Sequence, residues 1–288
     1  MWWKEVNKLS DAKNQNVNSL NALNVPDFDN LSLPEIANGI IEALLEPLRQ
    51  FQPLNPEPGV YPLPLEDNPV FLEVTPERVY GNLSHLNKQK APGPEGLCNW
   101  CLKEYAELLY QPIAGILNTS YIEQKIPSVW KHVDVTPLLT EKQVVDSKKK
   151  LRPISLTASL SKVAEDFVVS DYIRPALERK PDSNQFGTVS GSCTILALLS
   201  IIHEWLQATD GNNASVRVIL FDYRKAFDFN GHGTLAAKFK EVKVPNSVVK
   251  WILDFLSVRP QRVKLSRDCL SEWGAVPAGV SQGTKLGP

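Results

Sequence analysis

The chain has 288 residues and a formal net charge of −1, and its composition of 43% hydrophobic and 22% charged residues is that of a globular protein, which excludes a disordered chain. The longest apolar run, residues 195–202, is far shorter than the roughly 20 residues that a membrane-spanning helix needs, so we expect no membrane partner. Four cysteines are too few for a disulfide scaffold, which favours a reducing intracellular compartment, nuclear or cytoplasmic.

The near-zero net charge is a sum over two unlike parts of the chain. Residues 1–70 contain 4 basic and 10 acidic side chains and 9 of the 22 prolines, which leaves a net charge of +5 for the remainder. Dense proline removes backbone donors and favours extended conformations. We therefore predict an irregular, acidic, Pro/Asn-rich linker over 1–70, with one short helix over 35–49 and Pro34 at its start.

Beyond residue 70 helical and strand patterns alternate along the chain. Predicted helices cover 102–122 with a kink or break at Pro112, 159–172 with Ser159 as its cap, 193–206 as a buried helix, and a segment that starts at Ser247. Predicted strands cover 216–221, as a short central strand, and 261–266, as a half-exposed one. Strands separated by helices indicate an α/β or α+β fold.

Two carboxylates follow the predicted central strand. Asp222 comes directly after it and Asp228 lies six residues further on. A carboxylate at the carboxyl end of a buried strand can point into a crevice from a rigid base, as a Mg²⁺ ligand must. Aspartate also caps turns and helices very often, so the spacing by itself leaves a capping role open.

Residues 279–283 read Gly-Val-Ser-Gln-Gly and match the G-x-S-x-G pattern of a hydrolase nucleophile elbow. That chemistry needs an acid and a histidine later in the chain, and residues 284–288 contain neither. The pattern therefore favours a glycine loop that lets the backbone approach a ligand closely.

Two further motifs are less specific. Cys98 and Cys101 form a lone C-x-x-C without the second ligand pair of a structural zinc site, so we expect them to pack as small side chains. Lysines 148–150 are typical of a solvated loop. Arg152 differs because Pro153 restricts the backbone beside it, and a guanidinium held in this way suits a bidentate phosphate contact.

Five motifs in a fixed order make the overall pattern more specific than any one of them. They are KAPGPEGL at 90–97, LRPISL at 151–156, NQFG at 184–187, FDYRKAFD at 221–228 and AGVSQGTKLGP at 278–288. In this order they resemble the reverse transcriptases of non-LTR (LINE-type, jockey-like) retrotransposons. The resemblance implies part of a right-hand polymerase fold, with a fingers-like region over 71–190 and a partial palm over 191–288.

The resemblance also implies roles for single residues in RNA-directed DNA synthesis with Mg²⁺, in which an RNA template, a DNA primer and a dNTP are the partners. Asp222 matches the first catalytic carboxylate and metal ligand, and Tyr223 would offer its backbone carbonyl to the second metal. The nucleotide-binding positions are Arg152 at the triphosphate, Phe227 at the sugar, and Gln282 and Gly283 at the nucleotide and template. The matching template or structural loop positions are Lys90, Gly93, Gln185, Gly187 and Gly279.

The sequence departs from the family pattern in ways that bear on activity. Glu95 replaces a usual aspartate and Ser281 a usual proline, and the sequence ends at Pro288 before the family's Asp-Asp hairpin. It contains no Asp-Asp pair, and two metal ions need carboxylates from more than one strand. We therefore expect no polymerisation by this chain alone. The alternatives are a noncatalytic RNA- or DNA-binding remnant and a domesticated interaction protein, with the oligomeric state open.

Overall fold

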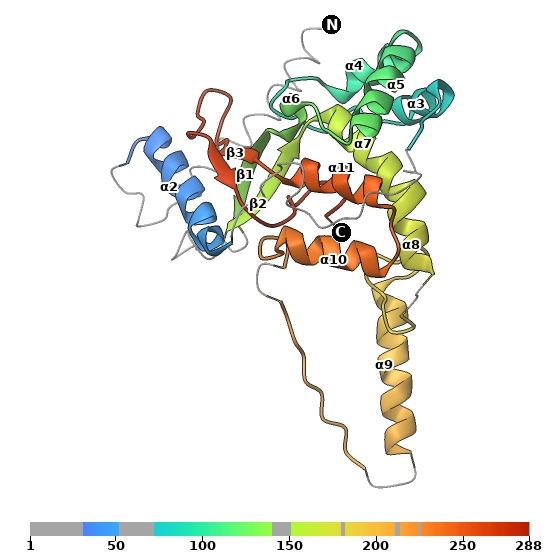
Figure 1. Cartoon of the computed structure of the whole chain (residues 1–288). Helices are drawn as coiled ribbons and strands as arrows, with labels where there is room; N and C mark the ends of the chain where they lie inside the picture. The colour runs from blue at the N-terminus through green and yellow to red at the C-terminus, as the bar shows by residue number, and fades with distance from the viewer. Residues whose placement is uncertain are drawn as a thin grey trace, which may run out of the picture.

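The computed structural model describes residues 31–51, 72–139, 151–179, 182–210, 214–223 and 226–287, and it has an α+β architecture (Figure 1). The strands are β1 (Val133–Leu139), β2 (Leu151–Thr157), β3 (Arg259–Val263) and β4 (Gly274–Val276). The helices before β2 are α2 (Leu33–Leu45), η2 (Glu46–Gln50), α3 (Pro76–Ser84), α4 (Asn99–Glu104), α5 (Ala106–Glu123) and α6 (Ser128–Lys131). Those after β2 are α7 (Ser159–Val168), the π-helix η3 (Val169–Ile173), α8 (Arg174–Glu178), α9 (Thr194–Thr209), α10 (His232–Glu241) and α11 (Asn246–Leu256).

The described strands form one mixed sheet in the order β2-β1-β3-β4. β1 pairs antiparallel with β2, with Ser155 opposite Val135, and parallel with β3, with Val263 opposite Val135. β4 adds an antiparallel edge to β3. The mixed strand directions confirm the α+β class.

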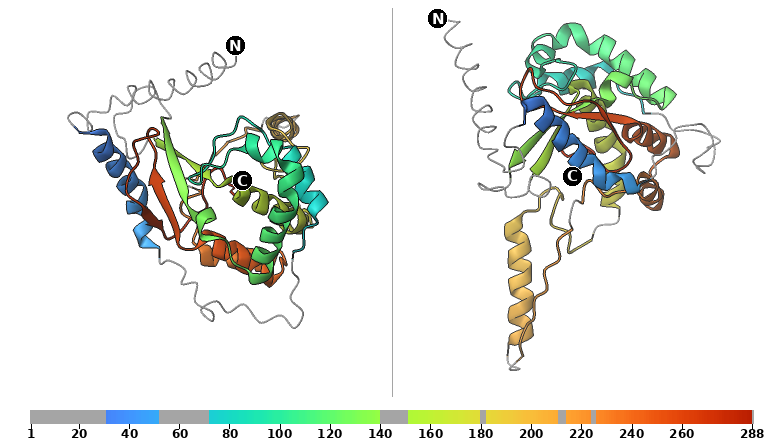
Figure 2. Two further views of the ribbon diagram at one scale, coloured as in Figure 1. Left: turned by 90° about the horizontal axis from the view of Figure 1, so that it is seen from above. Right: turned by 90° about the vertical axis from the view of Figure 1, so that its left-hand side faces the viewer.

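Helix α2, continued by η2, covers one face of the sheet, and the core-forming helices lie on the opposite side (Figure 2). Helix α2 has Pro34 in its first turn, and its Ile40 and Ile41 pack with Val263 and Leu265. The short helix predicted within 35–49 is thus confirmed, and it is packed against the sheet. The domain boundary at residue 70 stays a prediction.

The main core lies between the helices on the other side of the sheet. Trp251 and Phe255 of α11 are 1% and 0% exposed, and they pack with Leu117 of α5 and Val163 of α7. Burial of large aromatic and branched side chains is the dominant stabilising contribution to such a core. The helices predicted from 159 and 247 are confirmed, and this core fixes α7 relative to α5 and α11.

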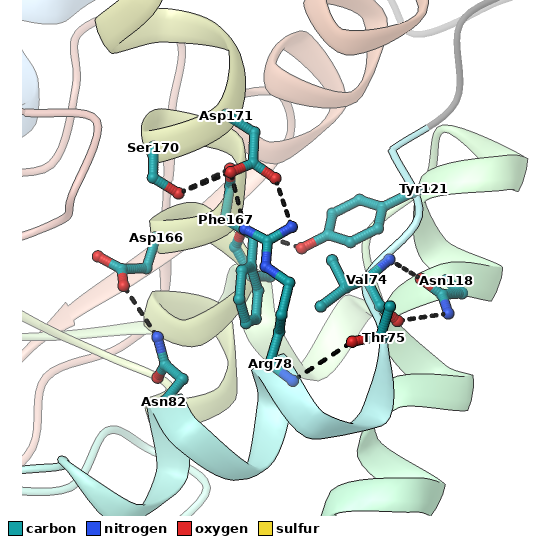
Figure 3. Close-up of polar contacts among 11 residues, drawn as sticks. Val74, Thr75, Arg78, Asn82, Asn118, Tyr121, Asp166, Phe167, Ser170 and Asp171 are labelled. Carbon is teal, nitrogen blue, oxygen red and sulfur yellow. Dashed lines mark hydrogen bonds and ion pairs between the residues drawn. The ribbon is translucent and has the colours of Figure 1, made fainter.

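Polar contacts join α3 to α7 and η3 at the edge of that core (Figure 3). The Arg78 guanidinium donates to both carboxylate oxygens of Asp171 at 2.9 and 2.8 Å and lies over the Phe167 ring. Asn82 donates to Asp166 at 2.9 Å. A bidentate arginine–carboxylate contact fixes orientation as well as distance, so these contacts set the position of α7 relative to α3.

Two helix boundaries differ from the sequence prediction. The break between α4 and α5 falls at Tyr105, whereas α5 continues through Pro112 because Ile113, Ala114 and Leu117 anchor the following turns in the core. Such packing offsets the one backbone hydrogen bond that proline removes.

Ser159 is not the N-cap of α7. The cap position is Ala158, and the Ser159 amide donates at 2.8 Å to a carboxylate oxygen of Glu95 from the 90–97 loop. The orphan amide at the start of α7 is therefore satisfied by a residue far away in the sequence, which a local pattern does not reveal.

Two further predictions are wrong. Helix α9 forms where predicted but has no buried residue, and residues 214–223 form no strand but an extended segment in which Leu220 is 91% exposed. Figures 1 and 2 show α9 projecting from the body and 214–223 returning as an extended chain. A strand needs a partner ladder and an apolar helix needs a packed face, and no other described segment supplies either. Within the described ranges, no helix has the length and apolar character to span a membrane.

Candidate functional site

A glycine loop, residues 279–283, joins two segments that are distant in the sequence. The Gly279 amide donates to the Asn230 carbonyl at 2.9 Å, and the Val280 amide donates to the Phe227 carbonyl at 2.8 Å. On the other side of the loop, the Ser155 amide of β2 donates to the Gln282 carbonyl at 2.9 Å. The loop thus fixes the 226–230 turn relative to β2.

Close backbone approach explains both glycines of this loop. Gly279 has φ +86°, and a methyl group there would lie 2.7 Å from the Asp228 carbonyl oxygen. Gly283 has φ +109°, and a methyl group there would lie 3.0 Å from the Ser155 carbonyl oxygen. Only glycine fits these conformations and distances without strain, so the backbone contacts of the loop depend on both.

The loop gathers several of the predicted nucleotide-binding positions. Arg152 is exposed and lies three residues before Ser155 on β2, whereas Phe227 and Gln282 are half-buried. A cavity of about 40 Å³ lies between these segments. Its lining includes Pro153, Ser155, Asp228, Arg259, Ser281 and Gln282. The structure therefore brings the segments that carry Arg152, Phe227, Gly279, Gln282 and Gly283 together.

The 90–97 loop packs against the carboxyl end of β2. Gly93 is buried, and a methyl group there would lie 2.6 Å from the Thr157 carbonyl carbon. Lys90, at the start of this loop, is exposed. Glu95 makes the α7 contact described above, so the residue that departs from the family pattern has a structural partner.

The predicted positions Gln185 and Gly187 lie apart from this site. They belong to an exposed loop before α9, in which the Gln185 side-chain amide donates to the Gly187 carbonyl at 2.7 Å. No hydrogen bond or ion pair between described residues joins them to the glycine loop. A template contact at these two residues stays a prediction.

The residues expected to hold magnesium do not form a metal site in this structure. Asp222 is exposed in the extended segment, and its neighbours Phe221 and Tyr223 are 87% and 85% exposed. Among the residues that the structure describes, no three His, Cys, Asp or Glu side chains are grouped so that they could hold a metal ion. The described residues therefore do not fit Mg²⁺, and the metal roles of Asp222 and Tyr223 stay predictions.

Two buried charged side chains beside the loop were not predicted from the sequence. Glu165 of α7 and Arg259 of β3 are 0% and 2% exposed. Burial raises the pKa of Glu165, although the positive charge of Arg259 opposes this shift. Burial lowers the pKa of Arg259 to about 10, so the guanidinium stays charged at neutral pH.

Arg259 stacks over the Phe255 ring at 4.2 Å, and its side-chain nitrogens have no hydrogen-bond partner within the described ranges. A cation–π contact is thus its main side-chain interaction. The sequence does carry one signal for Glu165, because Ser161 and Glu165 are polar residues four apart that flank the apolar i, i+3, i+4 series of 159–172.

His232 completes the support of the glycine loop. Its side chain is buried, and its Nε2–H donates to the Gly279 carbonyl at 2.9 Å, which fixes Nε2 as the protonated ring nitrogen of the neutral form. Burial lowers the pKa of His232, and the nearby charge of Arg259 acts in the same direction. The neutral His232 side chain therefore fixes the position of the Gly279 carbonyl through this hydrogen bond.

The remaining sequence motifs have simpler surroundings. Cys98 and Cys101 are both half-buried free thiols, and Cys98 occupies the N-cap position of α4. Lysines 148–150 lie outside the described residues.

Comparison with known proteins places the site in context. No protein-family model matches the chain. Three relatives from Drosophila melanogaster are similar to it: a probable RNA-directed DNA polymerase from transposon BS, another from transposon X-element, and the RNA-directed DNA polymerase from the mobile element jockey. They are 29%, 30% and 26% identical over 74%, 70% and 75% of the chain.

The matched region spans 23%, 22% and 23% of the length of these relatives. The similarity therefore concerns a part of each relative, and that part corresponds to most of this chain. The resemblance seen in the ordered motifs is confirmed, and the chain is a relative of the RNA-directed DNA polymerases of jockey-like non-LTR retrotransposons.

Proposed function

We propose that this chain is the fingers and front palm of a transposon reverse transcriptase, and that it holds the template strand and the incoming nucleotide. The observation that carries the proposal is the glycine loop, which links β2 to the 226–230 turn through backbone hydrogen bonds. Three motifs separated by dozens of residues thus meet around one cavity, as a composite binding site requires.

Chemically, the exposed Arg152 is suited to the triphosphate. Its guanidinium can donate two parallel hydrogen bonds to phosphate oxygens, and the β1–β2 pairing holds its backbone. Phe227, whose carbonyl accepts from the Val280 amide of the loop, offers an aromatic ring that could pack against a nucleotide sugar. Gln282 and Gly283 belong to the loop that is hydrogen-bonded to both segments.

We further propose that the 288 residues alone bind nucleic acid without extending a primer. Polymerisation would need Mg²⁺ held by Asp222 and the Tyr223 carbonyl, and the described residues do not fit that ion. Among the described residues, no three His, Cys, Asp or Glu side chains are grouped so that they could hold a metal ion. Binding at the glycine loop does not need these ligands, so binding and catalysis can be measured separately.

Binding is tested with a fluorescent RNA template annealed to a DNA primer, in the presence of dNTP, over a range of salt concentrations. We expect a Kd that rises steeply with salt, because cationic side chains displace counterions from phosphate. Arg152→Ala should weaken dNTP-dependent binding about tenfold. Arg179→Ala, an exposed arginine at the end of α8, is the matched control and should change it less than twofold.

Two outcomes would contradict the proposal: the absence of salt-dependent binding, or equal effects of the two arginine variants. Binding that neither dNTP nor Arg152→Ala changes would instead favour a noncatalytic nucleic-acid-binding protein. Primer extension with Mg²⁺ by the same preparation should be undetectable. Extension that Asp222→Ala abolishes would overturn the proposed inactivity of this chain.

A further inference from the structure

The segment that carries Arg152 makes one contact with the glycine loop and a second with residues 285–286, just after the loop. The first is the hydrogen bond from the Ser155 amide to the Gln282 carbonyl. The second lies on α7, which follows β2 after one residue, where the Glu165 carboxylate accepts from the backbone amides of Lys285 at 2.8 Å and Leu286 at 3.4 Å. One continuous stretch, β2 and α7, therefore holds the chain both at Gln282 in the loop and at residues 285–286 just after it.

Glu165 is one of two carboxylates among the described residues that are almost fully buried, at 0% exposed against 1% for Asp134. The Oε1 of Glu165 accepts from the Ser161 hydroxyl at 3.0 Å and its Oε2 accepts from the two amides of residues 285–286, while Arg259 supplies a positive charge. A buried carboxylate is costly unless it is hydrogen-bonded or paired with a cation, and these two amides are part of what offsets that cost. Ordering of the loop and burial of this carboxylate are thus coupled.

The neighbouring Asp166 offers a built-in comparison. It forms an ion pair with the Lys285 ammonium at 2.8 Å, but these side chains are 39% and 51% exposed. Such an exposed pair contributes little to stability. Two adjacent carboxylates on α7 therefore reach Lys285, and only Glu165 binds its backbone in a site shielded from water.

We propose that Glu165 is a positioning residue: it anchors residues 285–286, just after the glycine loop, and so fixes Gln282 and Gly283 relative to Arg152. The positioning of nucleotide contacts rests on the proposed function above, whereas the anchoring of the loop does not depend on it. Glu165 acts through the backbone of the loop and touches no substrate.

The test is residue-resolved hydrogen exchange of the free full-length chain. Glu165→Ala should accelerate exchange of the Lys285 and Leu286 amides at least about tenfold, the size expected for losing a hydrogen bond to a charged acceptor. Glu165→Gln retains one acceptor oxygen and should show a smaller acceleration. Asp166→Asn removes the exposed ion pair with Lys285, while its amide oxygen can still accept from Asn82, and it should leave both amides protected.

The amide of Ile252, in the core of α11, is the internal reference for global stability. Unchanged exchange at Lys285 and Leu286 in both Glu165 variants would overturn the proposal. Acceleration of Ile252 by the same factor as the Lys285 and Leu286 amides in Glu165→Gln would also overturn it, because the effect would then be global.

The same preparations are tested for dNTP-dependent binding of the RNA–DNA template–primer. Weaker binding in Glu165→Ala with partial recovery in Glu165→Gln supports positioning of the nucleotide contacts. Local loss of protection with unchanged dNTP-dependent binding would overturn that part. If the unaltered chain binds no template–primer while Glu165→Ala still loosens the loop, the proposed function fails and the anchoring role stands.

Discussion

The Ser155 amide and the Gln282 carbonyl are joined by a 2.9 Å hydrogen bond across 127 residues of sequence. This contact matters because Ser155 shares a strand with Arg152, whereas Gln282 belongs to the glycine loop. Two of the motifs that resemble a reverse transcriptase are therefore parts of one rigid unit. Substitutions that displace the loop should act on both motifs.

Gly279→Ala should destabilise the protein by about 1 to 3 kcal/mol, because the residue has φ +86° and the new methyl group would lie 2.7 Å from the Asp228 carbonyl oxygen. The free energy of unfolding from urea denaturation measures this cost. Gly233→Ala is the control, since Gly233 lies in α10 with no atom within 4 Å of the new methyl group. It should be neutral or stabilising by up to about 1 kcal/mol. Equal stability of the two variants would contradict the backbone contacts of the loop.

Truncation of a leucine on α5 should destabilise the protein much more than truncation of a leucine on α9. Leu117→Ala removes a 0% exposed core side chain and should cost about 2 to 5 kcal/mol. Leu198→Ala changes a side chain that is 54% exposed and should cost less than about 0.5 kcal/mol. Urea denaturation of both variants decides between the observed exposure of α9 and the burial that its composition predicts. A loss of several kcal/mol in Leu198→Ala would show that α9 is packed in solution.

Local sequence patterns predicted a helix correctly where its apolar side chains form one face that packs in the core. The i, i+3, i+4 series in 159–172 and the apolar residues after Ser247 predicted α7 and α11, since such periodicity reflects one buried face. The order of the motifs also identified the glycine loop and Arg152, which the structure brings together. These signals lie within short segments of sequence.

Partners that are distant in sequence account for what the patterns missed. Glu95 caps α7 and Glu165 anchors residues 285–286, and neither contact follows from local spacing. The apolar composition of α9 and of 216–221 predicts that their side chains are buried, but composition does not show which other segment would cover them. Burial is a property of the assembled fold, so composition alone gave the wrong environment for both segments.

The contact between Arg78 and Asp171 should contribute modestly to stability. The side chains are 44% and 26% exposed, so solvent screening limits the coupling between them to about 0.5 to 1 kcal/mol despite the bidentate geometry. A double-mutant cycle with Arg78→Gln and Asp171→Asn measures this coupling. The Lys88–Glu104 pair, whose side chains are 51% and 59% exposed, is the control and should show a smaller value. Equal coupling free energies in the two cycles would contradict the larger contribution expected for the Arg78–Asp171 pair.

His232 should make the protein less stable at mildly acidic pH. Burial lowers the pKa of His232 in the folded state below the ordinary value of 6.5, so the unfolded chain takes up this proton first as the pH falls. The free energy of unfolding should therefore fall from about pH 6.5 downwards, by up to about 1.4 kcal/mol per pH unit, and this loss should stop below the folded-state pKa.

His232→Gln isolates this contribution, because the glutamine amide can still donate to the Gly279 carbonyl but does not titrate. Urea denaturation between pH 5 and 8 should show a shallower decline for this variant than for the unaltered chain. His203→Gln, on the exposed helix α9, should leave the pH dependence unchanged. If His232→Gln and the unaltered chain lose stability in parallel, the buried neutral histidine does not couple the glycine loop to pH.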